Sequence, residues 1–196
     1  MYVPPGRGGW RRERYRSTMH IALLRAVNLG SHNKVPMAEL RRTFTDIGFT
    51  NARTLLQSGN VVFAGDGRST HELEALLEEA AHERLGLQTD FFVRTSAEWA
   101  SLIGDNPYPD EAERDPSHLL VMFLKQSPGD EDVDALRAAI KGRETVRARG
   151  RQAYIVYPDG IGRSRLTSAV IEKHLHTRAT GRNWNTVIKL GALAQG

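Results

Sequence analysis

The chain has 196 residues, of which 40% are hydrophobic and 26% charged, with a formal net charge of +4 and no cysteine. This length fits one compact domain or two small ones, and the lack of cysteine excludes disulfides, thiol nucleophiles and cysteine metal sites. No apolar run approaches the roughly 20 residues of a membrane span, so we expect a cytoplasmic protein with no membrane partner.

The N-terminal segment 1–18 carries the whole excess of positive charge. It contains five arginines and one acid, which leaves 22 basic and 22 acidic residues in 19–196. The segment is rich in Gly, Pro and Arg without apolar periodicity, so it predicts a disordered tail. The neutral body supplies no charge to hold a phosphate backbone, so only this tail would support a role as a nucleic-acid accessory protein.

Residues 19–104 show strand and helix patterns in the order β-α-β-β-α-β-α. The expected elements are a strand at 19–29, a helix at 36–48, a hairpin at 52–65 that turns at Ser58-Gly59, a helix that begins at Ser69, a strand at 90–95 and a short helix around Trp99. Ser69 and Glu72 have the spacing of a capping box, which marks the start of the second helix, and Gly86 marks its end.

Residues 105–116 are rich in proline and acids and predict a linker, after which the pattern repeats in 117–196. The expected elements are a strand at 118–125, a helix at 130–142, a hairpin at 144–158, a helix at 164–175, a weak strand near 176–180 and a last helix from Asn183. The stretches GDGRST and GIGRSR follow the third strand of each half. We therefore predict an α+β fold of two repeated ferredoxin-like units, each β-α-β-β-α-β plus a helix.

Four ordered stretches carry a family resemblance: IALLRAVNLGSHNKVPMAELR, GFTNARTLLQSGNVVF, DGIGRSRLT and TGRNWNTVIKL. Together they resemble the bacterial domain of unknown function 1697 family over roughly residues 19–193. The resemblance implies a two-repeat α+β fold and no established activity. This chain has Ala26 and Ser31 where the usual family pattern has glycine.

The stretch GIGRSR, residues 160–165, follows a predicted strand and precedes a predicted helix, which is the context in which glycine-rich loops hold phosphate. Arg163, Ser164 and Arg165 are therefore candidates to bind an anion. The same letters also fit a plain glycine turn in which Ser164 is the helix N-cap. The stretch matches neither G-x-G-x-x-G nor a P-loop, so both interpretations stay open.

The stretch TGRNWN adds Arg182 and Asn183 at the start of the last helix, with Lys189 further along it. Asn183 suits an N-cap and Trp184 a core position. Cations near a helix start oppose its macrodipole by about 0.3–1 kcal/mol, which favours an anion between them and the backbone amides. Because the expected topology puts both stretches at one sheet edge, we predict that TGRNWN and GIGRSR form a single anion site.

Polar residues also surround the predicted end of the first strand; they are Arg25, Asn28, Lys34, Gln57 and Asn60. Arg25 interrupts an apolar run, and a buried guanidinium requires an anionic partner, either an internal acid or a ligand. The other four residues fit a polar pocket and fit a network of turn hydrogen bonds equally well.

The sequence contains no H-E-x-x-H, no G-x-S-x-G and no evident pair of catalytic acids, and none of its seven histidines shows a carboxylate partner at ligand spacing. We therefore expect no metal and no cofactor, and we assign no catalytic residue. The leading hypothesis is binding of a small anionic, phosphate-bearing ligand, and the alternatives are an enzyme that acts on such a ligand or a nucleic-acid accessory protein. The sequence sets no oligomeric state.

Overall fold

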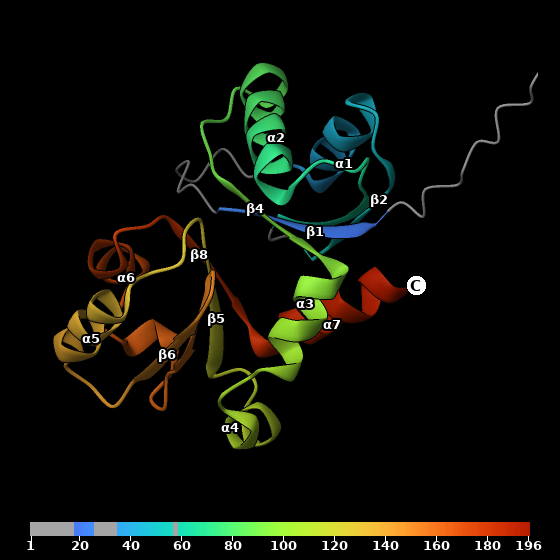
Figure 1. Cartoon of the computed structure of the whole chain (residues 1–196). Coiled ribbons are helices and arrows are strands. Elements are labelled where there is room, and N and C mark those ends of the chain that lie inside the picture. The colour runs from blue at the N-terminus through green and yellow to red at the C-terminus, as the bar shows by residue number, and fades with distance from the viewer. Residues whose placement is uncertain (1–17, 26–34, 57–58) are drawn as a thin grey trace, which may run out of the picture.

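The computed structural model describes residues 18–25, 35–56 and 59–196. Within these residues the chain forms two four-stranded antiparallel sheets and seven α-helices (Figure 1). The predictions for the tail, Asn28, Lys34, Gln57 and the turn at Ser58 concern residues outside this part of the chain.

The first half builds one sheet with the order β2-β3-β1-β4, in which all neighbouring strands are antiparallel. Its elements are β1 (Met19–Leu24), α1 (Met37–Asp46), β2 (Thr50–Leu55), β3 (Asn60–Ala64), α2 (Thr70–Leu85), β4 (Phe91–Thr95) and α3 (Ser96–Gly104). The predicted limits of α2 are confirmed, because Ser69 and Glu72 form a capping box and Gly86 has a left-handed backbone with φ +64°.

The second half builds a sheet with the order β6-β7-β5-β8. This order matches that of the first sheet, with β5, β6, β7 and β8 in the positions of β1, β2, β3 and β4. The elements after α3 are α4 (Pro109–Arg114), β5 (Leu119–Leu124), α5 (Asp130–Ala139), β6 (Thr145–Arg149), β7 (Gln152–Val156), the 3₁₀ turn η2 (Ile161–Arg163), α6 (Ser168–Leu175), β8 (Ala179–Asn183) and α7 (Trp184–Gln195).

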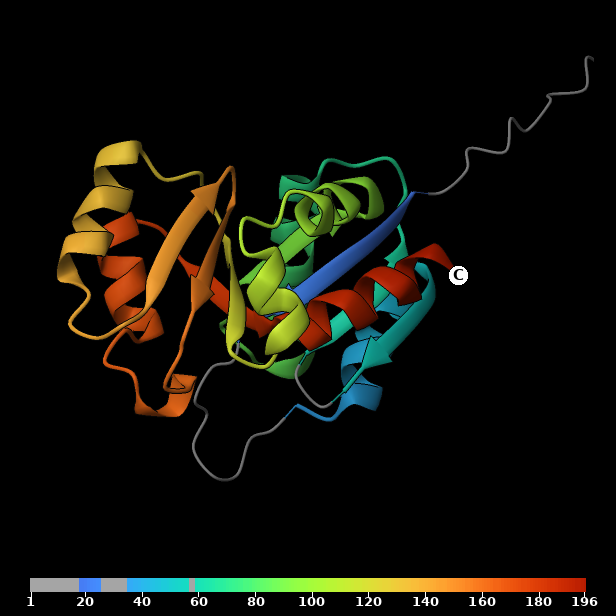
Figure 2. The ribbon, with the colours of Figure 1, turned by 90° about the horizontal axis from the view of Figure 1, so that it is seen from below.

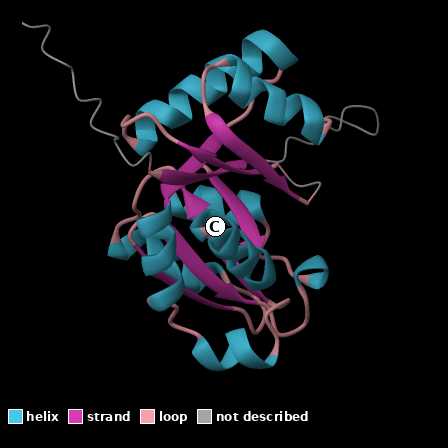
Figure 3. Cartoon of the chain, turned by 90° about the vertical axis from the view of Figure 1, so that its right-hand side faces the viewer, coloured by secondary structure: helices cyan, strands magenta, loops and turns pink. Residues whose placement is uncertain are grey.

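The helices and sheets form five layers (Figures 1 and 2). Helices α1 and α2 pack on the outer face of the first sheet, through side chains such as Phe44 and Leu77. Helices α5 and α6 pack in the same way on the second sheet, through Leu136 and Ile171. Helices α3 and α7 lie between the two sheets, and Figure 3, in which the C-terminus faces the viewer, shows that end of α7 between the upper and the lower sheet.

The central layer joins the two halves into one hydrophobic core. Trp99 of α3 stacks on Phe123 of β5 with ring centroids 4.9 Å apart, and its indole Nε1 donates to Val187 O of α7 at 3.0 Å. Gly191 of α7 lets the two helices approach, because a Cβ there would lie 2.9 Å from Cδ1 of Ile103 in α3. A buried tryptophan contributes several kcal/mol of stability, so neither half completes its core alone.

Several sequence predictions differ from the structure. The predicted linker 105–116 contains α4, whose first turn has Pro109 at the start followed by two acids, a composition that also favours a helix N-terminus. The first strand ends at Leu24, so Arg25 follows it and does not interrupt it. The residues TGRN belong to β8 rather than to a loop, because backbone pairing with β5 outweighs the weak strand propensity of Gly and Asn.

Candidate functional site

Arg182 lies in β8 and is buried between the two sheets, with 8% of its surface exposed. Its guanidinium donates from Nε to Asn60 Oδ1 at 2.6 Å, from Nη1 to Thr180 Oγ1 at 2.9 Å and Gly181 O at 2.8 Å, and from Nη2 to Leu24 O at 2.9 Å. Leu24 and Asn60 belong to the first sheet, so Arg182 connects the sheets. Burial lowers the pKa of Arg182 to about 10, so the group keeps its charge at neutral pH.

Arg94 holds the equivalent position in β4 and makes the reciprocal connection. Its Nη2 donates to Leu124 O at 2.9 Å and to Arg151 O at 2.8 Å, both in the second half. Burial, and then the nearby charge of Arg151, lowers the pKa of Arg94 to about 10. Each arginine thus binds the C-terminal end of the other sheet's first strand, at Leu24 or at Leu124.

Ion pairs at the ends of β1 and β5 follow the same reciprocal pattern. Arg25, directly after β1, pairs with Glu172 of α6 at 2.8 Å. Lys125, directly after β5, pairs with Glu74 and Glu78 of α2 at 3.0 and 2.5 Å. The interpretation of Arg25 as a member of an internal ion pair is therefore confirmed.

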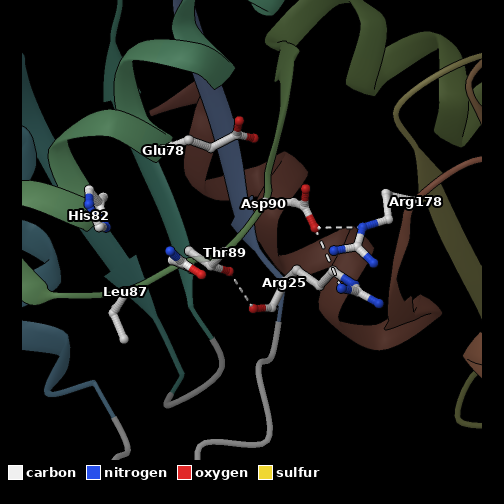
Figure 4. A pocket seen from close by; sticks show the side chains of 8 residues that line it. Arg25, Glu78, His82, Leu87, Thr89, Asp90 and Arg178 are labelled. Atoms are coloured by element: carbon white, nitrogen blue, oxygen red, sulfur yellow. Dashed lines mark hydrogen bonds and ion pairs between the residues drawn. The ribbon is translucent and has the colours of Figure 1, made fainter.

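A pocket of about 480 Å³ opens beside these ion pairs, and we call it the seam pocket (Figure 4). It is lined by Arg25, Glu78, His82, Leu87, Gln88, Thr89, Asp90 and Arg178. Asp90 pairs with Arg25 at 3.5 Å and with Arg178 at 3.3 Å, and the two guanidiniums converge on its carboxylate in Figure 4. Because these cations already have carboxylate partners, the seam pocket offers little unbalanced charge to an anionic ligand.

The predicted shared site of Arg163 and Arg182 is wrong. Both segments do leave the second sheet at one edge, since Val156 pairs with Leu119 and Asn183 with Leu120. The side chain of Arg182, however, points between the sheets and binds internal acceptors, whereas Arg163 is exposed in the turn after β7. A guanidinium that is buried in this way serves the fold rather than a surface ligand.

A second pocket, of about 560 Å³, lies where β5 begins, and we call it the turn pocket. It is lined by His118, Pro158, Asp159, Gly160, Gly162 and Arg163. Gly160 has φ +86°, a left-handed backbone that favours glycine and that directs the chain from β7 into η2. Part of the predicted anion-binding stretch, Gly160 to Arg163, therefore does line a pocket.

His118 faces this pocket and is held by a carboxylate. Its Nδ1 lies 2.6 Å from Asp115 Oδ2, and the other oxygen of Asp115 accepts from Ser117 Oγ at 2.6 Å. Tyr157 N donates to His118 O at 2.9 Å, which fixes the main chain. Nε2 is then the nitrogen that faces the turn, since a Cβ on Gly160 would lie 3.6 Å from it. An imidazole fixed through Nδ1 can hold or release a proton at Nε2.

The acids near the turn pocket remain ionised. The bond from Ser117, and then the proximity of His118, lowers the pKa of the Asp115 carboxyl. Asp159 accepts two hydrogen bonds from Arg143, one of them from Nε at 3.1 Å, and this pairing lowers the pKa of Asp159. Arg163 forms no salt bridge in the part of the chain that the structure describes, but its charge also lowers the pKa of the Asp159 carboxyl, which lines the same pocket.

Ser164 and Arg165 have other roles than the sequence suggested. The predicted helix start at Ser164 is wrong, because α6 begins at Ser168 and Thr167 is its N-cap. The Ser164 hydroxyl instead donates to Glu144 and accepts from Leu166 N at 2.9 Å, which holds the chain extended before the helix. Arg165 is exposed and does not line the turn pocket.

The remaining candidates lie on α7 and in the first sheet. Asn183 is confirmed as the N-cap of α7, because its Oδ1 accepts from Thr186 N at 3.0 Å. Lys189 is exposed on the same helix. Asn60 is buried and donates to Leu55 O at 3.0 Å besides accepting from Arg182, so it belongs to the connection between the sheets.

The His118–Asp115 pair escaped the sequence analysis, which found no carboxylate partner for any histidine. The available signal was the D-x-x-H spacing of DPSH, residues 115–118. This spacing alone specifies nothing, since it places the two side chains together only where the chain turns as it does here, with His118 N donating to Asp115 O at 3.1 Å.

These features define a class of α+β protein in which reciprocal buried arginines join two four-stranded antiparallel sheets and a histidine–aspartate pair borders an open pocket. Residues 18–154 match the family described as "Protein of unknown function (DUF1697)", and the chain belongs to that family. The resemblance carried by the sequence motifs is therefore confirmed.

Among solved structures, the chain is similar to the conserved bacterial protein SP0830 from Streptococcus pneumoniae. The TM-score is 0.69 and the identity 21%, and the match covers 90% of this chain and 98% of that one. At this identity the likeness shows the fold alone. The chain has no match among curated proteins.

Two further properties concern the residues that the structure describes. None of their helices combines the length and the apolar character needed to cross a membrane. These residues also contain no group of three or more His, Cys, Asp or Glu placed to hold a metal ion.

Proposed function

We propose that the protein binds a small anionic, phosphate-bearing ligand in the turn pocket. The observation that supports this most directly is the presence of Arg163 and His118 on one open pocket. Arg163 is exposed and forms no salt bridge among the described residues, and a guanidinium can bind phosphate oxygens in a bidentate manner. The seam pocket is a weaker candidate because Asp90 and Glu172 already neutralise its arginines.

The test is a titration of the ¹⁵N-labelled protein with inorganic phosphate, in which the backbone amide signals of Gly160 and Gly162 are followed by NMR. We expect saturable shifts of both signals and at least about tenfold weaker binding in Arg163→Gln, which corresponds to about 1.4 kcal/mol. Arg165→Gln is the matched control, because Arg165 is an exposed arginine of the same segment outside the pocket. Equal losses in both variants would indicate a nonspecific charge effect and would refute the site.

The second candidate is an enzyme that acts on the bound ligand, and the His118–Asp115 pair supports it. Proton transfer by a positioned histidine contributes typically about 10²–10⁴-fold to a rate. Release of inorganic phosphate from a phosphomonoester probe should then depend on His118, and Arg163→Gln should raise KM. Release that is unchanged in His118→Gln would exclude this role for the pair.

We also infer that the two halves are copies of one ferredoxin-like unit, each with an added helix. The matching strand orders support this duplication, as do the reciprocal contacts of Arg94 and Arg182. The units proposed from the sequence, 19–104 and 117–196, would then correspond element by element, with 105–116 between them.

A further inference from the structure

The two halves differ where the turn pocket forms. In the first half, Gly65 N donates to Thr18 O at 3.0 Å, and the N-cap of α2 follows Gly65 by four positions. In the second half, Tyr157 N donates to His118 O at 2.9 Å, but the N-cap of α6 follows Tyr157 by ten positions. The additional residues form the turn that lines the pocket, and His118 stands where the first half has a threonine.

The fixed charges around the turn pocket cancel. Arg163 and Asp159 line it, and Arg143 and Asp115 are the ion-pair partners of the lining residues Asp159 and His118, which makes two positive and two negative charges. Both carboxylates stay ionised near neutral pH, because neighbouring groups lower the pKa of each. A neutral His118 therefore leaves the pocket without net charge, and a protonated His118 gives it a charge of +1.

We propose that the turn pocket binds its anion together with a proton, which His118 carries on Nε2. This inference rests on the proposed function and specifies its ligand as an oxyanion, such as a terminal phosphate or sulfate group. Asp115 stabilises the imidazolium through Nδ1, and Nε2–H donates to a ligand oxygen while Arg163 binds the others. Binding and protonation are then linked, and each strengthens the other by the same factor.

The geometry explains why His118 is suited to this task. Its side chain is 38% exposed, so a proton from solvent can reach Nε2, and the ring is held at Nδ1 by Asp115 at 2.6 Å. The charged groups beside the pocket come from three segments, namely Asp115 before β5, Asp159 and Arg163 after β7, and Arg143, which pairs with Asp159. An anion in the pocket adds a negative charge on the Nε2 side, where no acid is bonded to the ring among the described residues.

The experiment uses sulfate, because sulfate keeps the same charge while the protein titrates. Its affinity is measured from the Gly160 and Gly162 amide signals at about pH 5.5 and about pH 7.5, which bracket the range where histidine changes charge. We expect binding several-fold tighter at the lower pH, with about tenfold as the limit. In saturating sulfate, the titration midpoint of the His118 ring signal should move up by about one pH unit.

Two variants locate the effect, and the folded state of each is checked by its amide spectrum. His118→Gln should bind sulfate equally at both pH values, whereas His82→Gln should keep the pH dependence, because His82 is an exposed histidine that lines the seam pocket. Asp115→Asn keeps the ring but removes its carboxylate, so the pH at which binding weakens should fall.

Binding of sulfate that does not depend on pH, or a pH dependence that persists in His118→Gln, would overturn the proton linkage and leave the proposed function intact. If neither phosphate nor sulfate shifts the Gly160 and Gly162 signals at either pH, the proposed function itself fails, and the linkage fails with it.

Discussion

Replacing Arg182 by alanine should strongly destabilise the fold, because this side chain connects the two sheets. The change removes the donors to Leu24 O and Asn60 Oδ1, which lie at 2.9 and 2.6 Å in the first sheet. A buried acceptor that loses its donor costs about 1–3 kcal/mol. Burying the charge of Arg182 itself costs free energy, as its lowered pKa shows, and the alanine variant no longer has this cost. The gain offsets part of the loss in stability. We expect the free energy of unfolding to fall by roughly 2–4 kcal/mol.

Equilibrium unfolding in urea, followed by the fluorescence of the buried Trp99 and Trp184, measures this change. Lys189→Ala is the matched control, since Lys189 is exposed on α7 and its loss should stay within about 0.5 kcal/mol. Arg182→Lys should recover little, because an ammonium cannot reproduce the forked donors of a guanidinium. If Arg182→Ala cost less than about 1 kcal/mol, as expected of an arginine that binds only a surface ligand, the role of Arg182 in joining the sheets would be refuted.

Two further predictions concern the central core. Trp184→Ala should lower the free energy of unfolding by about 3–5 kcal/mol in the same urea assay. The reason is that Trp184 is 6% exposed and packs in the core between the sheets. A loss below about 1 kcal/mol would show that Trp184 does not belong to this core. Burial, and then Asp105, raises the pKa of Tyr154 to about 12, above roughly 10 in an unfolded chain. The folded state therefore holds this proton more tightly, so stability should be complete below about pH 10 and decline as the pH rises toward 12. Tyr154→Phe should flatten that decline between about pH 10 and pH 12, and an unchanged slope would contradict the assignment.

The local elements could be predicted from the sequence because their signals are local. Ser69 and Glu72 are three residues apart, and Gly86 ends the helix through its own backbone. Asn183 caps α7 through an amide three residues further on. Such interactions depend little on the rest of the fold, which is why α2 and the start of α7 were predicted correctly.

The candidate site was only partly predictable, because its geometry depends on distant contacts. The partner of Arg182 at Leu24 is 158 residues away in the sequence, and nothing near Arg182 indicates that its side chain points between the sheets. Part of GIGRSR, including Arg163, does line a pocket. The histidine that lines the same pocket, His118, comes from a distant part of the sequence, directly before β5. Polar residues at a helix start look the same in the sequence whether they bind a ligand or their own chain.

The place of α7 between the sheets has a consequence for synthesis of the protein. The ribosome synthesises β4 about 90 residues before it synthesises α7. At roughly 5–20 residues per second, the delay between the two elements is about 5–18 s. During that interval the inner face of the first sheet, including Ile21 and Phe92, lacks α7, which covers it in the folded protein. The nascent first half therefore presents an apolar sheet face to the cell, and chaperones that bind such surfaces should retain the chain until α7 emerges.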